Sequence, residues 1–305
     1  MAVRIAYFGL PLGAVLLLRA GAELVSIALG HPTAIGARRV RRLATGIVLD
    51  KPSLDDETIV ERIATTKPDA ILSWFWPRRI PERVLRLAPR GAFGVHPSLL
   101  PRHRGADPYF HAILAGDHET GVTLHRLDAS YDTGAILDHR TLAIRENENA
   151  WQLARRLDRP SLALLLDCAR RLDAGDPLDG TPQDEALATP ADAPSEDDLV
   201  IDWNRDAAYL ARLVRAAAPS PGAIAQLGDA LVAVIEARAV DDAPRVLEPG
   251  EAFFVDGRVH VRASERGALR IDRVLIEDTE GDAGDIVTVG QELHDDAIAR
   301  LVPRV

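Results

Sequence analysis

Short apolar runs alternate with helical patterns along the first hundred residues, and this alternation constrains the fold more than any other feature. Val3–Phe8 and Leu24–Leu29 are largely apolar, as expected of strands that are covered on both faces. Further strand-like runs lie at 70–76 and 91–95, and helical patterns at 14–20, 58–65 and 81–87. Strands and helices in this order predict a parallel sheet with helices on both faces.

The second half of the chain is organised differently. Two more strand patterns and a long helical pattern come first, over 120–128, 134–144 and 151–172. Residues 175–198 are rich in Asp, Ala and Pro, which predicts a linker. Short β patterns separated by Gly and Asp follow at 231–236, 252–255, 258–261 and 269–276. We therefore expect an α/β domain with a mostly parallel sheet over 1–174 and a small β-barrel domain over 199–305.

Charge and cysteine content limit the partners and the compartment. The 305-residue chain has 36 basic and 46 acidic residues, so its overall field does not attract nucleic acid, although a local basic face can still bind phosphate. The single cysteine, Cys168, lies in an apolar helical pattern and is expected in the core; it allows no internal disulfide and suits a reducing compartment. The apolar run Leu10–Leu18 contains proline and glycine and has no basic leader. We expect a cytoplasmic protein that does not contact membranes.

A histidine at a predicted strand end begins a distinctive series of residues. His96-Pro97 leads directly into Ser98-Leu99-Leu100-Pro101, Arg104-Gly105 follows, and Asp132-Thr133-Gly134 comes after a later strand pattern. Ligands of open α/β sheets bind at the carboxyl ends of the strands, which is where His96 lies. The position is therefore one where a catalytic side chain is expected.

This series resembles the active-site region of the folate-dependent formyltransferases, a family that includes the methionyl-tRNA formyltransferases and the UDP-amino-sugar formyltransferases. The resemblance is strong over 91–144, moderate over 200–223 and weak at both ends. It implies a Rossmann-like formyltransferase fold followed by an OB-like C-terminal domain. It also implies a one-carbon transferase, methionyl-tRNA-formyltransferase-like in architecture, that moves a formyl group from 10-formyltetrahydrofolate to a primary amine.

The resemblance assigns proton transfer to His96 and orientation of its ring to Asp132. Imidazole exchanges protons near neutral pH, and a neighbouring carboxylate favours its charged form. The alternative is a purely structural contact between a strand-end histidine and a loop carboxylate. The family carries Asn-x-His, whereas Gly94 stands at the asparagine position here.

Loss of one donor to the reacting carbonyl oxygen typically costs about 10²–10³-fold in rate, or roughly 3–4 kcal/mol. Either another donor or a water replaces the amide, or the substrate differs, or catalysis is lost. Ser98 and His103 are the nearest candidate donors in the sequence; the alternatives are a serine that caps the turn and an exposed histidine.

The resemblance also predicts a folate cleft. Trp74, Trp76, Leu99 and Leu100 occupy the matching region, and the loop from Asp128 to Asp132 is expected to close over the pteridine. Side chains alternate along a strand, so only one face of Trp74-Phe75-Trp76 can line the cleft, and the alternative for both tryptophans is ordinary core. Folate hydrolysis by the same His–Asp pair and folate binding without turnover are the competing functions.

The acceptor amine is open between aminoacyl-tRNA and a nucleotide-linked amino sugar. Arg38 and Arg41 share a face if residues 36–42 are helical, and together with Ser98 and Arg104 they are candidate substrate-binding residues. A solvated helix surface is the alternative for the two helical arginines. The five histidines from 96 to 125 lie on different predicted elements without a cysteine partner or metal-ligand spacing, so no metal site is expected.

Overall fold

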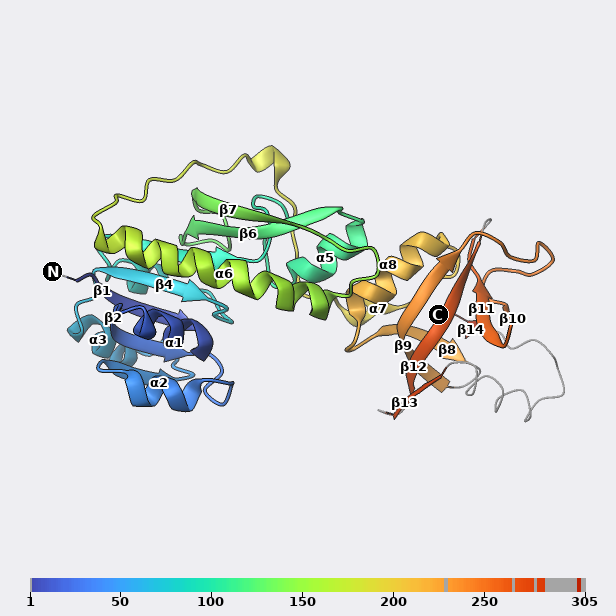
Figure 1. The fold of residues 1–305 in the computed structure, drawn as a ribbon, viewed down its shortest axis with the longest axis horizontal. Coiled ribbons are helices and arrows are strands. Elements are labelled where there is room, and N and C mark those ends of the chain that lie inside the picture. The colour runs from blue at the N-terminus through green and yellow to red at the C-terminus, as the bar shows by residue number, and fades with distance from the viewer. Residues whose placement is uncertain (1, 228–229, 265–266, 277–278, 283–300, 303–305) are drawn as a thin grey trace. The chain divides into compact units, whose positions relative to one another are not determined.

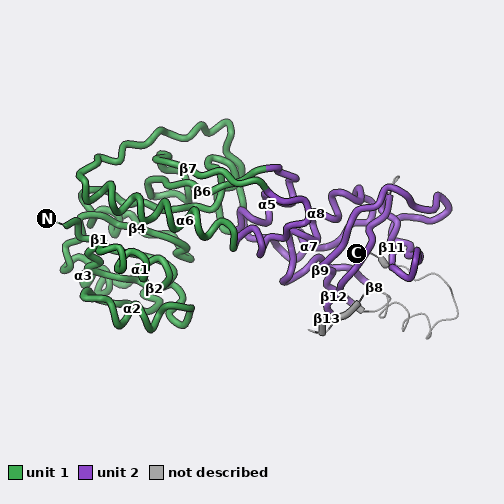
Figure 2. The backbone as a smooth tube through the Cα atoms, in the orientation of Figure 1, with its two compact units in different colours: residues 1–106, 119–143, 155–191 green, residues 107–118, 144–154, 192–305 purple. Residues whose placement is uncertain are grey.

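The chain folds into two compact units. The structure, a computed structural model, describes residues 2–227, 230–264, 267–276, 279–282 and 301–302. Residues 1–106, 119–143 and 155–191 form the first unit, and residues 107–118, 144–154 and 192–305 the second (Figure 2). The domain boundaries at 174 and 198 stay a prediction.

The first unit is an α/β layer structure (Figure 1). Its strands are β1 (Arg4–Gly9), β2 (Glu23–Leu29), β3 (Ile47–Asp50), β4 (Ala70–Trp74), β5 (Ala92–His96), β6 (Glu119–Arg126) and β7 (Ile136–Ala143). Its helices are α1 (Pro11–Arg19), α2 (Ala37–Leu43), α3 (Glu57–Thr65), α4 (Glu82–Leu85), the greater part of α6 (Ala150–Asp173) and the 3-10 turn η1 (Glu185–Leu187).

The strands form one sheet in the order β3-β2-β1-β4-β5-β6-β7. The first five of these strands in the sheet run parallel, whereas β6 is antiparallel to β5 and β7 antiparallel to β6. The predicted mostly parallel sheet is confirmed. Its two antiparallel strands matter for function, because the connection between them carries Asp132.

Helices cover both faces of this sheet. On one face, Phe8 and Ile71 pack with Ile63 of α3 and Val84 of α4 in a buried cluster. The opposite face is covered by α1 and α6, and Figure 1 shows α6 lying along the strands. Gly13 of α1 lies so close to the sheet and to α6 that an added Cβ would be 2.3 Å from the Tyr7 hydroxyl oxygen. Neighbouring residues of the central strands point to opposite faces of the sheet and are therefore both buried.

Several elements differ in extent from the sequence prediction. Helix α1 begins at Pro11, three residues earlier than expected, because a proline at the first helical position has no N–H that would be left unpaired. Strand β4 ends at Trp74, so Phe75 and Trp76 lie in the loop that follows it. Phe75 has a φ of +54°, which ends the extended run.

The second unit combines helices with an antiparallel sheet. Its helices are α5 (Pro108–Ala115), α7 (Glu196–Leu199) and α8 (Ala207–Ala217). Its strands are β8 (Ala223–Leu227), β9 (Ala230–Val240), β10 (Ala252–Val255), β11 (Arg258–Arg262), β12 (Ala268–Ile276), β13 (Thr279–Asp282) and β14 (Leu301–Val302). The strands follow the order β10-β11-β12-β9-β8-β14, and β13 pairs with β12. The antiparallel C-terminal sheet agrees with the expected fold class.

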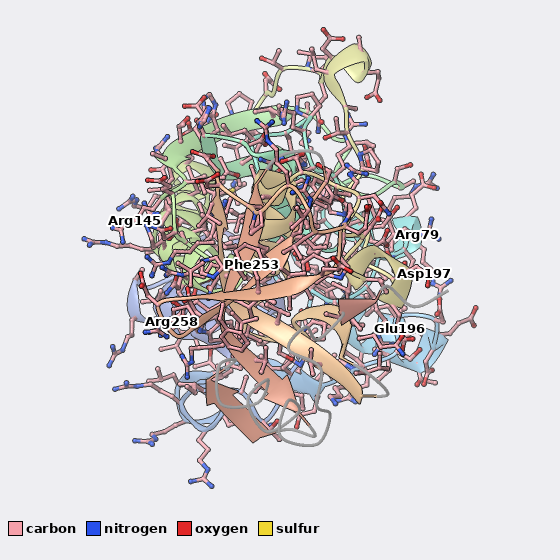
Figure 3. The ribbon with its side chains drawn as sticks, turned by 90° about the vertical axis from the view of Figure 1, so that its right-hand side faces the viewer. Arg79, Arg145, Glu196, Asp197, Phe253 and Arg258 are labelled. Carbon is pink, nitrogen blue, oxygen red and sulfur yellow. The ribbon has the colours of Figure 1, made fainter. Side chains whose placement is uncertain are left out.

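Side chains across this second sheet pair as its register requires. Phe253 of β10 lies opposite His260 of β11, and their rings stack with centroids 5.3 Å apart. Figure 3 labels Phe253 and Arg258 on these two strands and also Glu196 and Asp197, both exposed, on α7. Within the described residues, no helix has the length and apolar character that a membrane span needs.

Candidate active site

His96 is the last residue of β5 and lies almost buried at the end of the sheet. Its side chain is 7% exposed, and its Nε2 lies 2.7 Å from the carbonyl oxygen of His103. A carbonyl can only accept, so Nε2 carries the proton that it donates. The other ring nitrogen, Nδ1, faces Asp132 Oδ2 at 3.4 Å. The ring is therefore held between a backbone acceptor and a carboxylate.

Asp132 comes from the loop between β6 and β7, which folds back toward the end of β5. Its backbone has a φ of +55°, an uncommon conformation for a residue with a side chain. Two contacts hold it there: the Gly105 N–H donates to Oδ2 at 3.1 Å, and the Gln183 side-chain amide donates to the backbone carbonyls of Asp132 and Gly134. The pairing of His96 with Asp132 that the sequence predicted is thus present in the fold.

Gln183 is a site residue that sequence reasoning missed. It lies in the segment that composition marks as linker, yet its amide closes the Asp132 loop at 2.8 and 2.7 Å. Its Oε1 accepts from Arg104, whose guanidinium also makes a two-pronged contact with Glu185 at 2.8 Å. The hydrogen bond to Glu185 raises the pKa of Arg104 further. No pattern in the sequence distinguishes this glutamine from the polar residues around it.

Gly94 lies directly opposite His125 on β6. Residues paired across two strands share a face of the sheet, and so do residues two apart along a strand, so Gly94, His96 and His125 lie on one face. His125 is 2% exposed, and its Nε2 faces Asp132 Oδ1 at 3.5 Å. The structure thereby adds a second histidine to the His–Asp pair.

The two residues proposed as replacement donors have structural partners. The Ser98 hydroxyl donates to the carbonyl of Arg102 at 2.7 Å, as a turn-capping serine does. His103 is buried rather than exposed, and its N–H donates to Thr189 Oγ1. A substrate-binding role for Ser98 stays a prediction.

The two tryptophans lie on opposite faces of the sheet. Trp74 is paired with Val95, so it shares the face away from His96, and it is 2% exposed. Trp76 is half-buried and packs against the cluster on the His96 face, edge-on to Phe8 at 5.5 Å between ring centroids. Of the two, Trp76 therefore lies on the same side of the sheet as His96, and the folate-binding roles of both tryptophans stay predictions.

The remaining residues predicted to line the folate cleft differ in their exposure. Leu99 is half-buried and Leu100 buried, one residue apart in the turn after His96. Asp128 is exposed and accepts from the Ser130 N–H and the Thr133 hydroxyl, so it shapes the loop that carries Asp132. The folate-binding roles of these three residues stay predictions.

Two of the arginines predicted to bind the acceptor, Arg38 and Arg41, lie on α2. Arg38 is exposed, whereas Arg41 forms an ion pair with Asp50 at 2.7 Å. Arg79, labelled in Figure 3, fastens the loop after β4 to the Asp132 loop: its N–H donates to the Tyr131 hydroxyl at 3.1 Å and its guanidinium to the Ala129 carbonyl at 3.2 Å. Substrate-binding roles for Arg38 and Arg41 stay predictions.

Comparison with known proteins agrees with this geometry. A family model described as formyl transferase matches residues 26–168, and one described as formyl transferase, C-terminal domain, matches residues 195–283. Methionyl-tRNA formyltransferase from Anaeromyxobacter dehalogenans is 36% identical over 90% of this chain and 93% of its own length. The chain belongs to the formyltransferase family. The same enzyme from Methylobacillus flagellatus is 36% identical over 90% of this chain and 92% of its own.

Solved structures resemble this formyltransferase in fold. HypX from Aquifex aeolicus in complex with tetrahydrofolic acid matches with a TM-score of 0.64 and 21% identity over 96% of this chain and 48% of that one. The formyltransferase thus spans about half of HypX. An N-formyltransferase from Helicobacter canadensis in complex with folinic acid and dTDP-3-aminofucose matches with a TM-score of 0.63 and 15% identity, over 89% and 99% of the two chains.

Proposed function

We propose that this formyltransferase uses 10-formyltetrahydrofolate to formylate a primary amine. His96 transfers the proton that the reaction moves, and Asp132 orients the His96 ring. The observation that carries this proposal is the approach of His96 Nδ1 to Asp132 Oδ2 at 3.4 Å, between residues from two separate elements. Tetrahydrofolate and folinic acid in two related structures support a folate donor.

The residues next to His96 fit a flat heteroaromatic donor. Trp76 follows the strand that pairs with β5, lies on the His96 face and offers a half-buried ring. Its indole Nε1 is buried without a hydrogen-bond partner among the described residues, a polar atom available to a ligand. When bound, the donor supplies the activated formyl group, and Trp76 and Leu99 would provide apolar contacts.

Formyl transfer needs a proton to leave the amine and a proton to reach the leaving nitrogen. Because Nε2 of His96 donates to the His103 carbonyl, a second proton on the ring lies on Nδ1, where it faces Asp132. The carboxylate stabilises the imidazolium that results and fixes its orientation. Asp132 is the more exposed partner at 17%, so protons reach the pair from the carboxylate side.

We infer that the acceptor is a small molecule, because the charge of the chain is divided unevenly. Residues 192–305 contain 12 arginines and no lysine against 23 carboxylates, which leaves 24 basic and 23 acidic residues over 1–191. A segment with this excess of negative charge repels the phosphate backbone of tRNA. Aminoacyl-tRNA is the second candidate, favoured by the identity to methionyl-tRNA formyltransferases.

Transfer of labelled formyl from 10-formyltetrahydrofolate to amino-sugar nucleotides and to charged initiator tRNA, measured in parallel, tests both statements. The proposal expects label in the small amine and its loss in His96→Ala. Label that appears only in tRNA would overturn the inference that the acceptor is a small molecule, while formyl transfer itself would stand. Release of formate at the same rate without any amine would show that the enzyme hydrolyses the folate donor and does not transfer its formyl group. Folate binding without turnover would show that the protein has no formyltransferase activity.

A further inference from the structure

His125 lies over the position where this chain has glycine in place of the family asparagine. It is the cross-strand partner of Gly94, and a Cβ added to Gly94 would lie 3.4 Å from His125 Nε2. A longer side chain there would compete with the ring for the same space. The glycine therefore leaves room for a buried imidazole beside the catalytic pair.

Two backbone carbonyls determine how both rings present their nitrogens. His125 Nδ1 lies 2.8 Å from the Arg126 carbonyl oxygen, so this nitrogen carries a proton and donates it. The free nitrogen of His125, Nε2, then faces Asp132 Oδ1 at 3.5 Å. His96 is arranged in the mirror sense, with Nε2 on the His103 carbonyl and Nδ1 on Asp132 Oδ2. Each ring thus turns its second nitrogen to one oxygen of the same carboxylate.

This arrangement accommodates one additional proton. With both rings neutral, a nitrogen lone pair faces each oxygen of a carboxylate, which is unfavourable on both sides. One added proton converts one of these contacts into an ion pair, whereas a second would place two cations in a buried site with ring centroids 6.5 Å apart. The three side chains therefore form a unit that holds a single excess proton.

The surroundings of His125 disfavour its charged form. Burial lowers the pKa of His125; the Asp132 carboxylate opposes this, His96 lowers the pKa further, and the more distant Asp128 raises it. The net direction is down, so His125 is neutral near pH 7. Its Nε2 lone pair is then free to accept.

We propose that His125 is a positioning residue of the active site that orients Asp132 and serves as the second group that can hold the shared proton. While His96 gives its Nδ1 proton to the leaving nitrogen, the proton that the amine loses passes through Asp132 to His125 Nε2. It returns through the carboxylate to His96, so the proton count is unchanged over a turnover. Only this proton transfer during turnover rests on the proposed function, because the arrangement of His96, Asp132 and His125 exists without substrate.

Histidine NMR titration of the full chain, with no substrate present, tests the unit separately from the reaction. We expect His125 to carry its neutral proton on Nδ1 and to titrate below the usual histidine range. In His96→Ala the pKa of His125 should rise, because a competing positive ring is gone, and in Asp132→Asn it should fall. A His125 pKa that is the same in all three proteins would overturn the proposal, whatever the enzyme formylates.

Kinetics of His125→Phe test the role in turnover. Phenylalanine keeps a flat ring over Gly94 and removes both nitrogens, so thermal unfolding should show a folded protein. Loss of a residue that orients a catalytic group typically costs about 10- to 100-fold, and we expect this loss in kcat with KM unchanged and an altered pH–rate profile. His139→Gln, at an exposed position in the middle of β7, is the matched control and should behave as wild type. A His125→Phe enzyme with wild-type kcat and pH profile would reduce His125 to a core residue.

Discussion

Replacing Gly94 with asparagine restores the family side chain at a position where this fold has filled part of the space. A Cβ on Gly94 would lie 2.7 Å from Leu127 Cδ2 and 3.4 Å from His125 Nε2. Carbon atoms in good contact are about 3.5–4.0 Å apart, so the Leu127 methyl has to move by about 1 Å. Leu127 is half-buried, and the obstructing atom is the end of a flexible side chain, so a change of rotamer can supply this movement.

The expected effect on stability is small and negative. Overfilling a packed site costs about 1–3 kcal/mol, and replacing glycine returns about 0.4–1 kcal/mol by restricting the unfolded chain. For a chain of this size, a loss of about 1 kcal/mol lowers Tm by about 2–4 °C. We therefore expect Gly94→Asn to lower Tm by a few degrees. Adding Leu127→Ala in the same chain should remove the clash with the new side chain.

The expected effect on catalysis has the opposite sign. If a missing amide limits the rate, its return adds one donor to the reacting oxygen, worth at most about 10²–10³-fold in kcat. Single-turnover formyl transfer should be measured for Gly94→Asn, Gly94→Asn/Leu127→Ala and Leu127→Ala, with Gly94→Ala as the control that adds the Cβ without the amide. Equal rates for the double variant and Leu127→Ala would refute the reasoning, because the amide would then be present without effect.

Three further outcomes follow from named contacts. His96→Ala and Asp132→Asn should each lower kcat by about 10²–10⁴-fold while the protein stays folded by circular dichroism; a smaller loss would remove both from proton transfer. Gln183→Ala deletes the two hydrogen bonds that its amide donates to the Asp132 loop, worth about 0.5–1.5 kcal/mol each, together with its contact to Arg104, so hydrogen exchange of 128–135 should accelerate; unchanged exchange would show that the loop does not depend on them. Burial raises the pKa of the Cys168 thiol to about 12, so a thiol reagent at pH 8 should modify the unfolded chain and not the native one; rapid native labelling would contradict this.

The strands that the sequence predicted are those whose apolar runs are long. Strands β1 and β2 are buried on both faces and are therefore nearly continuous in apolar residues. Helix α2 carries four arginines in seven residues and β3 has only four residues, so neither shows a clear period to recognise. Strand β8 directly follows a proline-rich turn and contains two alanines in five residues, a residue type that is depleted in strands, so it was not predicted.

The site was predictable where its residues belong to a local series and not where they meet across the fold. His96 lies at a strand end, and Asp132 lies in an Asp-Thr-Gly series, so both could be named from the sequence. Gln183 contributes through contacts to residues about 50 positions away, and composition alone assigns it to a linker. Arg104 stays a candidate substrate-binding residue, and no local pattern predicts the contacts of its guanidinium with Gln183 and Glu185.

The order of strands and helices, the His96–Asp132 pair and the missing amide at Gly94 were determined by the sequence itself, because each depends on residue type and short spacing. Tertiary structure decided which of two tryptophans shares the face of His96 and which is buried behind the sheet. It also decided that Gly94 has a histidine opposite it. The first outcome depends on Phe75, whose φ of +54° ends β4 so that Trp76 no longer follows the alternation of the strand. The second depends on register between strands, which is set by packing of the whole sheet, since a slip of one residue would turn every side chain to the other face.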